Sequence, residues 1–145
     1  MIRAVLFDKD GTLLEFDTLW GAATRRVLPS FLRALSVPAE HRLYERMLEA
    51  LGVTEVGVDA AKALAWMPYA QMAAVLVKAL EEEGFGIKNA DAAAILTKLY
   101  YKEITRPEAK IIPTGDLTQV MNRLKNRKCL IGLATADGER AAKFC

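Results

Sequence analysis

The first apolar segment of the chain is short and ends abruptly. Residues Ile2 to Phe7 are apolar apart from Arg3 and rich in branched side chains, and a polar stretch from Asp8 to Thr12 follows. A continuous apolar run of this length is typical of a strand buried on both faces of a parallel sheet. The pattern therefore predicts a buried parallel strand over 2–7 and a polar turn directly after it.

A long stretch with helical periodicity follows this turn. Apolar residues recur at helical spacing after Thr18, a candidate N-cap, and Pro29 is expected to kink or divide this first helix. The pattern predicts four more helices in succession with no strand between them. Their expected ranges are Pro38 to a stop at Gly52, Asp59 to Pro68, Pro68 to Gly84, and Asp91 to Tyr101.

The strand pattern returns near the end of the chain. After a connector over 111–116, the sequence predicts a helix from Asp116 to about Arg127 and a second buried strand from Cys129 to Ala134. A turn over 135–138 and a last helix from Glu139 follow. Two strands do not make a stable parallel sheet. We therefore expect further strands from C-terminal sequence that completes the sheet, or from a partner chain such as a second copy. The side chains expected to point inward from the helix before the second strand are Leu117, Val120, Met121 and Leu124.

The composition indicates a globular chain. Of its 145 residues, 52% are hydrophobic and 26% are charged, which provides apolar area to offset the entropy of ordering the backbone. The net charge of +2 is too small to suggest a nucleic-acid-binding or membrane-surface protein. The longest uncharged run, Ala63 to Val77, is too short to span a bilayer, and no signal peptide is visible. Two cysteines without metal-site spacing favour a reducing, cytoplasmic location.

Candidate chemistry lies in the turn after the first strand. Side chains two residues apart point the same way along an extended segment, so Asp8 and Asp10 can approach one cavity while Lys9 points elsewhere. Two carboxylates this close repel each other unless a proton or a cation lies between them, and Mg²⁺ prefers such oxygen ligands. Gly11 permits a close backbone approach, and Thr12 adds a hydroxyl and an N–H for an anion. This set suits phosphoryl transfer through an aspartyl phosphate.

The stretch from Asp8 to Leu13, DKDGTL, follows a hydrophobic strand and resembles the first motif of the haloacid dehalogenase superfamily of phosphohydrolases. The second strand, which leads into Thr135, resembles the second motif, and Pro113 to Gly115 looks like its usual lead-in. The resemblance implies an α/β fold: the N-terminal portion of a Rossmann-like parallel-sheet core over 1–16 and 105–145, with an inserted all-helical cap over 17–104. Such caps occur in relatives of phosphoglycolate phosphatase and β-phosphoglucomutase and close over small phosphate esters.

The resemblance also implies a role for each matching residue. Asp8 would be the nucleophile and, through its carboxylate, a Mg²⁺ ligand. Asp10 would protonate the leaving-group oxygen and then activate water, and its main-chain carbonyl would also bind Mg²⁺. Thr135 and the N–H of Ala136 would hold the phosphoryl oxygens, with Thr12 as a further phosphate-binding candidate. Because the dehalogenase branch lacks the second aspartate, Asp10 favours phosphate chemistry.

The expected function is therefore Mg²⁺-dependent hydrolysis of a small phosphorylated metabolite. The third and fourth motifs of the superfamily, which supply a lysine and further acidic metal ligands, lie well downstream of the second, and the chain ends at Cys145. We accordingly expect little or no phosphatase activity from the 145-residue chain alone. Two alternatives stay open: a non-catalytic fragment that binds phosphate or a partner, and a sugar-phosphate mutase that uses the same first motifs.

Several other residues have simpler explanations than a site. Lys9 is expected at the surface or rim and His41 at the surface. Asp137 could reach the site or cap the last helix, and capping is the favoured interpretation. The basic residues between Arg123 and Lys128 suit the dipole of a helix C-terminus, and Cys129 is expected to be inert within a buried strand. A strand-end threonine hydroxyl also often hydrogen-bonds locally. Aromatic and methionine side chains around one proline could line a cleft but are more often core: Trp66, Met67, Tyr69 and Met72.

Overall fold

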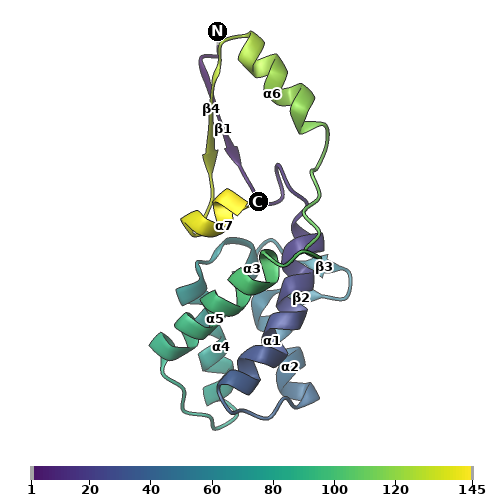
Figure 1. Ribbon diagram of the computed structural model, residues 1–145. Helices are drawn as coiled ribbons and strands as arrows, with labels where there is room; N and C mark the ends of the chain where they lie inside the picture. Colours follow the sequence, from purple (N-terminus) through teal and green to yellow (C-terminus); the bar gives the residue numbers. More distant parts are fainter. Residues whose placement is uncertain (1, 145) are drawn as a thin grey trace.

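The computed structural model describes residues 2–144, and the side chains of these residues apart from 140 and 141. The molecule has two parts, which lie one above the other in Figure 1. The sheet part contains β1 (Ala4–Asp8), α6 (Leu117–Asn126), β4 (Leu130–Ala134) and α7 (Glu139–Phe144). The helical cluster contains η1 (Asp17–Gly21), α1 (Ala22–Ala34), α2 (His41–Leu51), β2 (Val53–Thr54), β3 (Gly57–Val58), α3 (Ala63–Trp66), α4 (Tyr69–Glu81) and α5 (Asn89–Ile104).

The two strands of the sheet part pair in parallel. Their register runs from Ala4 opposite Leu130 to Asp8 opposite Ala134. The strands therefore end at the same level, and the turns that follow them meet at one edge of the sheet, where ligands bind in open α/β sheets. A small parallel sheet with a helical insertion between its strands confirms the predicted α/β class.

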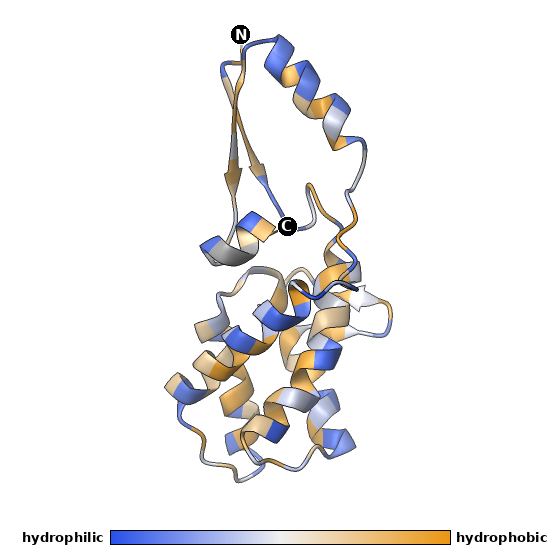
Figure 2. Ribbon diagram, in the orientation of Figure 1, coloured by the Kyte–Doolittle hydropathy of each residue, from blue (hydrophilic) through white to orange (hydrophobic). Residues whose placement is uncertain are grey.

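The strands are far less covered than predicted. Leu6 is 70% exposed and Leu130 is 74% exposed, although both strands carry the apolar colouring of Figure 2. Cys129 is half-buried and precedes β4. The expectation of strands buried on both faces is wrong for the described residues, because two strands offer too narrow a surface for helices to pack on. For the same reason α6 buries none of its residues. Of the four side chains expected to point inward, Leu117, Met121 and Leu124 are half-buried, and Val120 is exposed.

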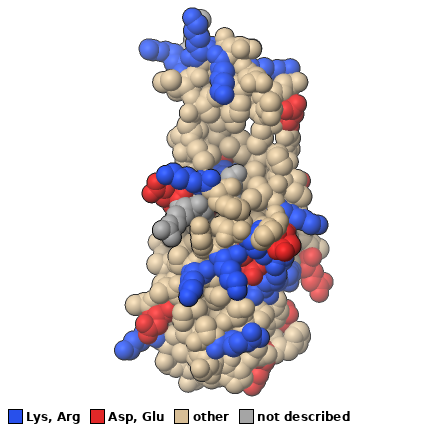
Figure 3. Space-filling view, viewed as in Figure 1, with Lys and Arg blue, Asp and Glu red and all other residues tan. Residues whose placement is uncertain are grey.

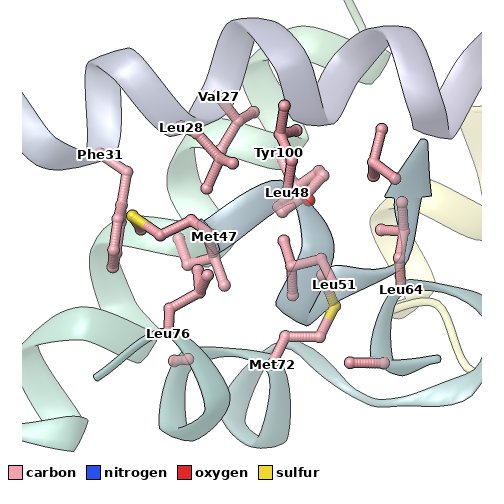
Figure 4. Packing of buried hydrophobic residues seen from close by; sticks show 14 of the residues in the cluster. Val27, Leu28, Phe31, Met47, Leu48, Leu51, Leu64, Met72, Leu76 and Tyr100 are labelled. Carbon is pink, nitrogen blue, oxygen red and sulfur yellow. The ribbon is translucent and has the colours of Figure 1, made fainter. Parts of the chain in front are cut away.

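The hydrophobic core lies in the helical cluster. The residues of its buried cluster all fall between Leu19 and Ile104 in the sequence. Figure 4 shows side chains from α1, α2, α4 and α5 meeting at its centre, among them Phe31, Met47 and Leu76. Burial of one such side chain contributes about 1.5–3 kcal/mol. The helical cluster is therefore the stable part of the molecule, on which residues that face the sheet part can be held.

The helices follow the predicted order but differ at their ends. α2 stops at Gly52 as predicted, with the glycine in a left-handed conformation at φ +87°. Pro29 does not divide its helix, because it lies inside α1, which has buried residues on both sides of it. Thr18 lies inside the helical segment rather than at an N-cap, and its hydroxyl donates to the Glu15 carbonyl at 3.3 Å.

A short hairpin interrupts the run of helices, which corrects the expectation that no strand lies between them. β2 and β3 pair antiparallel, with Val53 opposite Val58. The main-chain N–H of Val58 donates to Asp17 Oδ1 at 2.8 Å and so attaches the hairpin to η1. Each strand is two residues long, too short to produce an alternating pattern that sequence periodicity could detect.

Two segments connect the sheet part to the helical cluster, and they lie side by side. Glu15 N donates to the Ile112 carbonyl at 2.8 Å, and Thr114 N donates to the Leu13 carbonyl at 2.9 Å. The Thr114 hydroxyl also donates to the Thr12 carbonyl at 2.6 Å. These contacts place the helical cluster beyond the carboxyl ends of β1 and β4, as Figure 1 shows.

The surface carries charges of both signs. Figure 3 shows basic and acidic side chains mixed over the helical cluster, and basic side chains at the outer end of the sheet part, where α6 lies. Arg123 and Lys125 occupy the last turn of α6, the position that a helix dipole favours for cations. Within residues 2–144, no helix is long and apolar enough to cross a membrane.

Candidate active site

A tight turn after β1 positions the two aspartates. Gly11 has φ +81°, a left-handed conformation that favours glycine. Gly11 N donates to the Leu14 carbonyl at 2.8 Å, and Leu13 N and Leu14 N donate to the Lys9 carbonyl at 2.9 and 3.1 Å. The turn therefore closes directly after Asp10 and keeps this residue at the edge of the sheet, beside the end of β4.

A cavity of about 100 Å³ lies between the sheet part and the helical cluster. Its wall on the sheet side consists of Asp8, Asp10, Thr135, Ala136 and Asp137, which come from the end of β1 and from the turns after β1 and β4. Four of the five residues that the sequence nominates are thus brought together at one cavity, although the two turns lie at opposite ends of the chain. Their roles there remain predictions.

Thr12 is the nominated residue that does not line the cavity. It is exposed, and its hydroxyl donates to Asp8 Oδ2 at 3.3 Å. Thr12 thus contacts the predicted nucleophile.

The two aspartates differ in their surroundings. Asp8 is exposed and has the Thr12 contact described above. The side chain of Asp10 is only 17% exposed, and its Oδ1 accepts hydrogen bonds from Trp20 Nε1 at 2.8 Å and from Lys9 Nζ at 2.9 Å. Two donors on one oxygen fix the orientation of this carboxylate and leave Oδ2 for proton transfer. Asp8 is thus open to a ligand, and Asp10 is held in place beside it.

Lys9 is buried, which corrects its expected place at the surface or rim. Its side chain is 3% exposed, and Nζ lies 2.9 Å from Asp10 Oδ1, 2.8 Å from Asp137 Oδ2 and 5.7 Å from the centroid of the Trp20 ring. Burial alone lowers the pKa of Lys9, but the hydrogen bonds to Asp137 and Asp10, together with their charges, outweigh it and raise that pKa above its ordinary value. The alternation argument failed because β1 ends at Asp8. The feature of the sequence that could have predicted this burial is the position of Lys9 between two aspartates, directly after an apolar strand.

Asp137 lines the cavity instead of capping α7. This helix begins at Glu139, so Gly138 occupies the position before it, while the Asp137 carboxylate pairs with Lys9. Burial raises the pKa of Asp137, and the contacts with Lys9 offset this only in part. The main-chain N–H of Asp137 donates to Thr135 Oγ1 at 3.2 Å, so Thr135 makes a local hydrogen bond and also faces the cavity.

Trp20 connects the helical cluster to Asp10 and had no predicted role beyond the core. It lies on η1, a π-helical turn, and such turns occur frequently at functional sites. Its ring centroid lies 5.9 Å from that of Tyr100, and Tyr100 stacks on Tyr69 at 5.2 Å. These rings hold the indole that donates to Asp10. Helical periodicity placed Trp20 on an apolar face but contained no signal for this hydrogen bond.

The wall opposite the carboxylates is apolar. It consists mainly of the segment around Pro68, where Trp66 is 55% exposed and Met72 is 2% exposed. The segment was expected either to line a cleft or to pack in the core. Both interpretations hold, because some of its side chains pack in the core while the segment also lines the cavity.

The oxygen donors suit part of a Mg²⁺ site. Asp8 offers a carboxylate that is open to the cavity, and the Asp10 main chain lies at the same edge. Within residues 2–144, no group of three His, Cys, Asp or Glu is arranged to hold a metal ion. Mg²⁺ usually keeps several waters and binds one or two carboxylates together with substrate phosphate oxygens. The residues present fit such a partial set.

Comparison with known proteins identifies the family. The family model of the haloacid dehalogenase-like hydrolases matches residues 2–145, and the chain belongs to this family. No curated protein sequence matches the chain.

One solved structure shares the fold, and a second is similar over about the same part of the chain. A protein named as a β-phosphoglucomutase from Thermotoga maritima is 20% identical, with a TM-score of 0.53 over 98% of this chain and 53% of that one. The L-2-haloacid dehalogenase from Xanthobacter autotrophicus is 16% identical, with a TM-score of 0.38 over 99% of this chain and 50% of that one. The chain thus spans about half the length of the solved structures that it matches.

Proposed function

We propose that the protein containing this chain hydrolyses a small phosphomonoester and that the reaction passes through an aspartyl phosphate on Asp8. The observation that supports this most strongly is the cavity shared by Asp8, Asp10 and Thr135 beyond the carboxyl ends of β1 and β4. Family membership supports hydrolase or phosphoryl-transfer chemistry in general. The second aspartate favours phosphate as the group transferred.

In the first step, a carboxylate oxygen of Asp8 attacks phosphorus, and the bond from phosphorus to the leaving-group oxygen breaks. Asp10 gives a proton from Oδ2 to that oxygen, while Trp20 and Lys9 hold Oδ1. The Thr135 hydroxyl and the Ala136 N–H donate to the phosphoryl oxygens. Mg²⁺, held by the Asp8 carboxylate and the Asp10 main-chain carbonyl, would supply neutralisation of negative charge on the phosphoryl group.

In the second step, Asp10 takes a proton from a water molecule whose oxygen attacks phosphorus. The bond between phosphorus and Asp8 breaks, which releases inorganic phosphate and restores the Asp8 carboxylate. We propose that residues 17–104 act as the cap over this reaction, because they supply the apolar wall of the cavity that the aspartates line and an apolar cover disfavours bulk water at the reacting groups.

Trapping of the phosphoryl enzyme tests the proposal without requiring turnover. The chain is mixed with Mg²⁺ and p-nitrophenyl phosphate, whose leaving group needs no protonation, then quenched in acid and weighed by intact mass spectrometry. We expect a fraction of wild-type chains to carry one added PO₃ group and no Asp8→Asn chain to carry it. The modified fraction should be larger in Asp10→Asn, because the second step is slowed. An adduct that persists in Asp8→Asn, or no adduct in any variant, contradicts the proposal.

The same experiment separates the alternatives. A chain that binds phosphate but never gains PO₃ is a binding module. A phosphoryl enzyme that passes PO₃ to a hexose 1-phosphate faster than to water is a mutase. We favour the hydrolase, acting on a small phosphorylated metabolite. A reducing, cytoplasmic setting agrees with the sparse cysteines.

A further inference from the structure

The cavity has two walls of opposite character. Three carboxylates, those of Asp8, Asp10 and Asp137, line the sheet side, whereas the side formed by the helical cluster is entirely apolar or aromatic. A phosphoryl group bound at Asp8 therefore directs its leaving group toward the second wall, because that wall faces the aspartates. The side chains that matter most for this argument are Trp20, Leu64, Trp66, Met67 and Met72.

Charge limits what the leaving group can carry. Among the residues that the structure describes, no Lys, Arg or His lines the cavity. Lys9, the nearby cation, is engaged by Asp10 and Asp137. A carboxylate or a second phosphoryl group on the leaving group would lose its hydration against the apolar wall.

We propose, on the premise of the proposed function, that the substrate is a phosphomonoester with a small, uncharged, apolar leaving group such as a single aromatic ring. Aromatic side chains offer a ring both apolar contact and stacking, and Trp66, which is 55% exposed, is one of the side chains that line the cavity. The enclosed volume of about 100 Å³ is below the roughly 150 Å³ that encloses a benzene ring, so only a small leaving group fits against this wall. Hydroxyl groups of a sugar would lose their hydrogen bonds to water against this wall.

Stable phosphonates test the proposal in the chain as it exists. Methylphosphonate, benzylphosphonate and 3-phosphonopropionate present the same phosphoryl-like group with no further group, an aromatic ring or a carboxylate. The two tryptophans of the chain, Trp20 and Trp66, both line the cavity, so intrinsic fluorescence reports its occupancy. With Mg²⁺ present, we expect benzylphosphonate to bind at least about tenfold more tightly than methylphosphonate, and 3-phosphonopropionate to bind no more tightly than methylphosphonate.

A variant of the apolar wall provides the second measurement. Trp66→Arg adds a guanidinium there at a position that is already 55% exposed, and Trp66→Phe is the matched control. We expect Trp66→Arg to bind benzylphosphonate no more tightly than methylphosphonate. It should also bind 3-phosphonopropionate more tightly than the wild type does. Trp66→Phe should keep the wild-type order of affinities.

The outcomes distinguish this inference from the proposed function. If methylphosphonate binds but the ring adds nothing, or the carboxylate ligand binds as tightly as the ring, the substrate inference is wrong and the phosphoryl site stands. If Trp66→Arg leaves the order unchanged, the leaving group does not lie on this wall, and the inference is wrong. If no phosphonate binds, both proposals are contradicted.

Discussion

At the scale of single residues, Lys9 balances the charges of the candidate site. Its ammonium lies within 3 Å of two carboxylates while its side chain is 3% exposed. A buried charge of this kind is favourable only when its partners stay in place, and removal of one member leaves the others desolvated and unpaired. Lys9 therefore links the turn after β1 to the turn after β4.

Replacement of Lys9 tests this role. We expect Lys9→Met to lower the free energy of unfolding by about 2–4 kcal/mol, because Asp10 and Asp137 then repel each other without a cation between them. Adding Asp137→Asn should recover part of the loss, as a double-mutant cycle in urea would measure. The control is Lys143→Met, which removes the exposed pair with Glu139 and should cost no more than about 0.5 kcal/mol. Equal losses for the two single variants would contradict the account.

At the scale of elements, glycines in left-handed conformations end two helical segments. Gly52 has φ +87° and Gly84 has φ +86°, so both avoid a strain that other residues would carry. Their surroundings differ. A Cβ at Gly52 would lie 2.3 Å from Lys62 Cβ, whereas a Cβ at Gly84 would meet nothing within 4 Å.

This pair gives a matched test of packing around α2. We expect Gly84→Ala to cost about 1 kcal/mol from backbone strain alone. Gly52→Ala should cost about 1–3 kcal/mol more, because the segment carrying Lys62 has to move away from the new methyl group. Urea unfolding of both variants measures the difference. A similar loss in both would show that the approach between Gly52 and Lys62 is unimportant for stability.

The order of elements could be predicted from the sequence, but several of their contacts could not. The end of the first strand to within one residue of Phe7, the end of the second at Ala134, the stop at Gly52 and the turn that begins at Thr135 follow from local patterns of apolar, polar and glycine residues. The burial of Lys9 depends on Asp137, near the other end of the chain, and the hydrogen bond from Trp20 to Asp10 depends on how a helical segment sits against the turn before it. Periodicity reports which face of one element is apolar, and it carries no information about which distant polar group a side chain meets.

At the scale of the whole molecule, stability rests on the helical cluster, and Tyr100 lies at its centre. Thr24 donates to the Trp20 carbonyl at 2.8 Å, so the Tyr100 hydroxyl, 2.7 Å away, donates to the Thr24 oxygen. Burial raises the pKa of Tyr100 well above its ordinary value, and the hydrogen bond with Thr24 offsets only part of this effect. The folded chain thus keeps a proton that the unfolded chain releases in alkaline solution.

The free energy of unfolding is expected to fall in alkaline solution. Below the ordinary tyrosine pKa of about 10 both states hold the proton, and above it the unfolded state alone loses it, so stability falls as the pH rises further. We expect Tyr100→Phe to be about 1 kcal/mol less stable at neutral pH but to lose stability less steeply above about pH 10. Urea unfolding across alkaline pH measures both slopes, with Tyr101→Phe as the control. Parallel slopes for Tyr100→Phe and the wild type would contradict this explanation.

The central claim is that Asp8 accepts the phosphoryl group, and the most direct measurement locates that group in the chain. Borohydride reduces an aspartyl phosphate to homoserine, so peptide sequencing by mass spectrometry of the trapped and reduced Asp10→Asn variant identifies the modified position. The account predicts homoserine at position 8 and unchanged aspartate at position 137. Homoserine at position 137, or an unmodified chain after exposure to p-nitrophenyl phosphate and Mg²⁺, would contradict it.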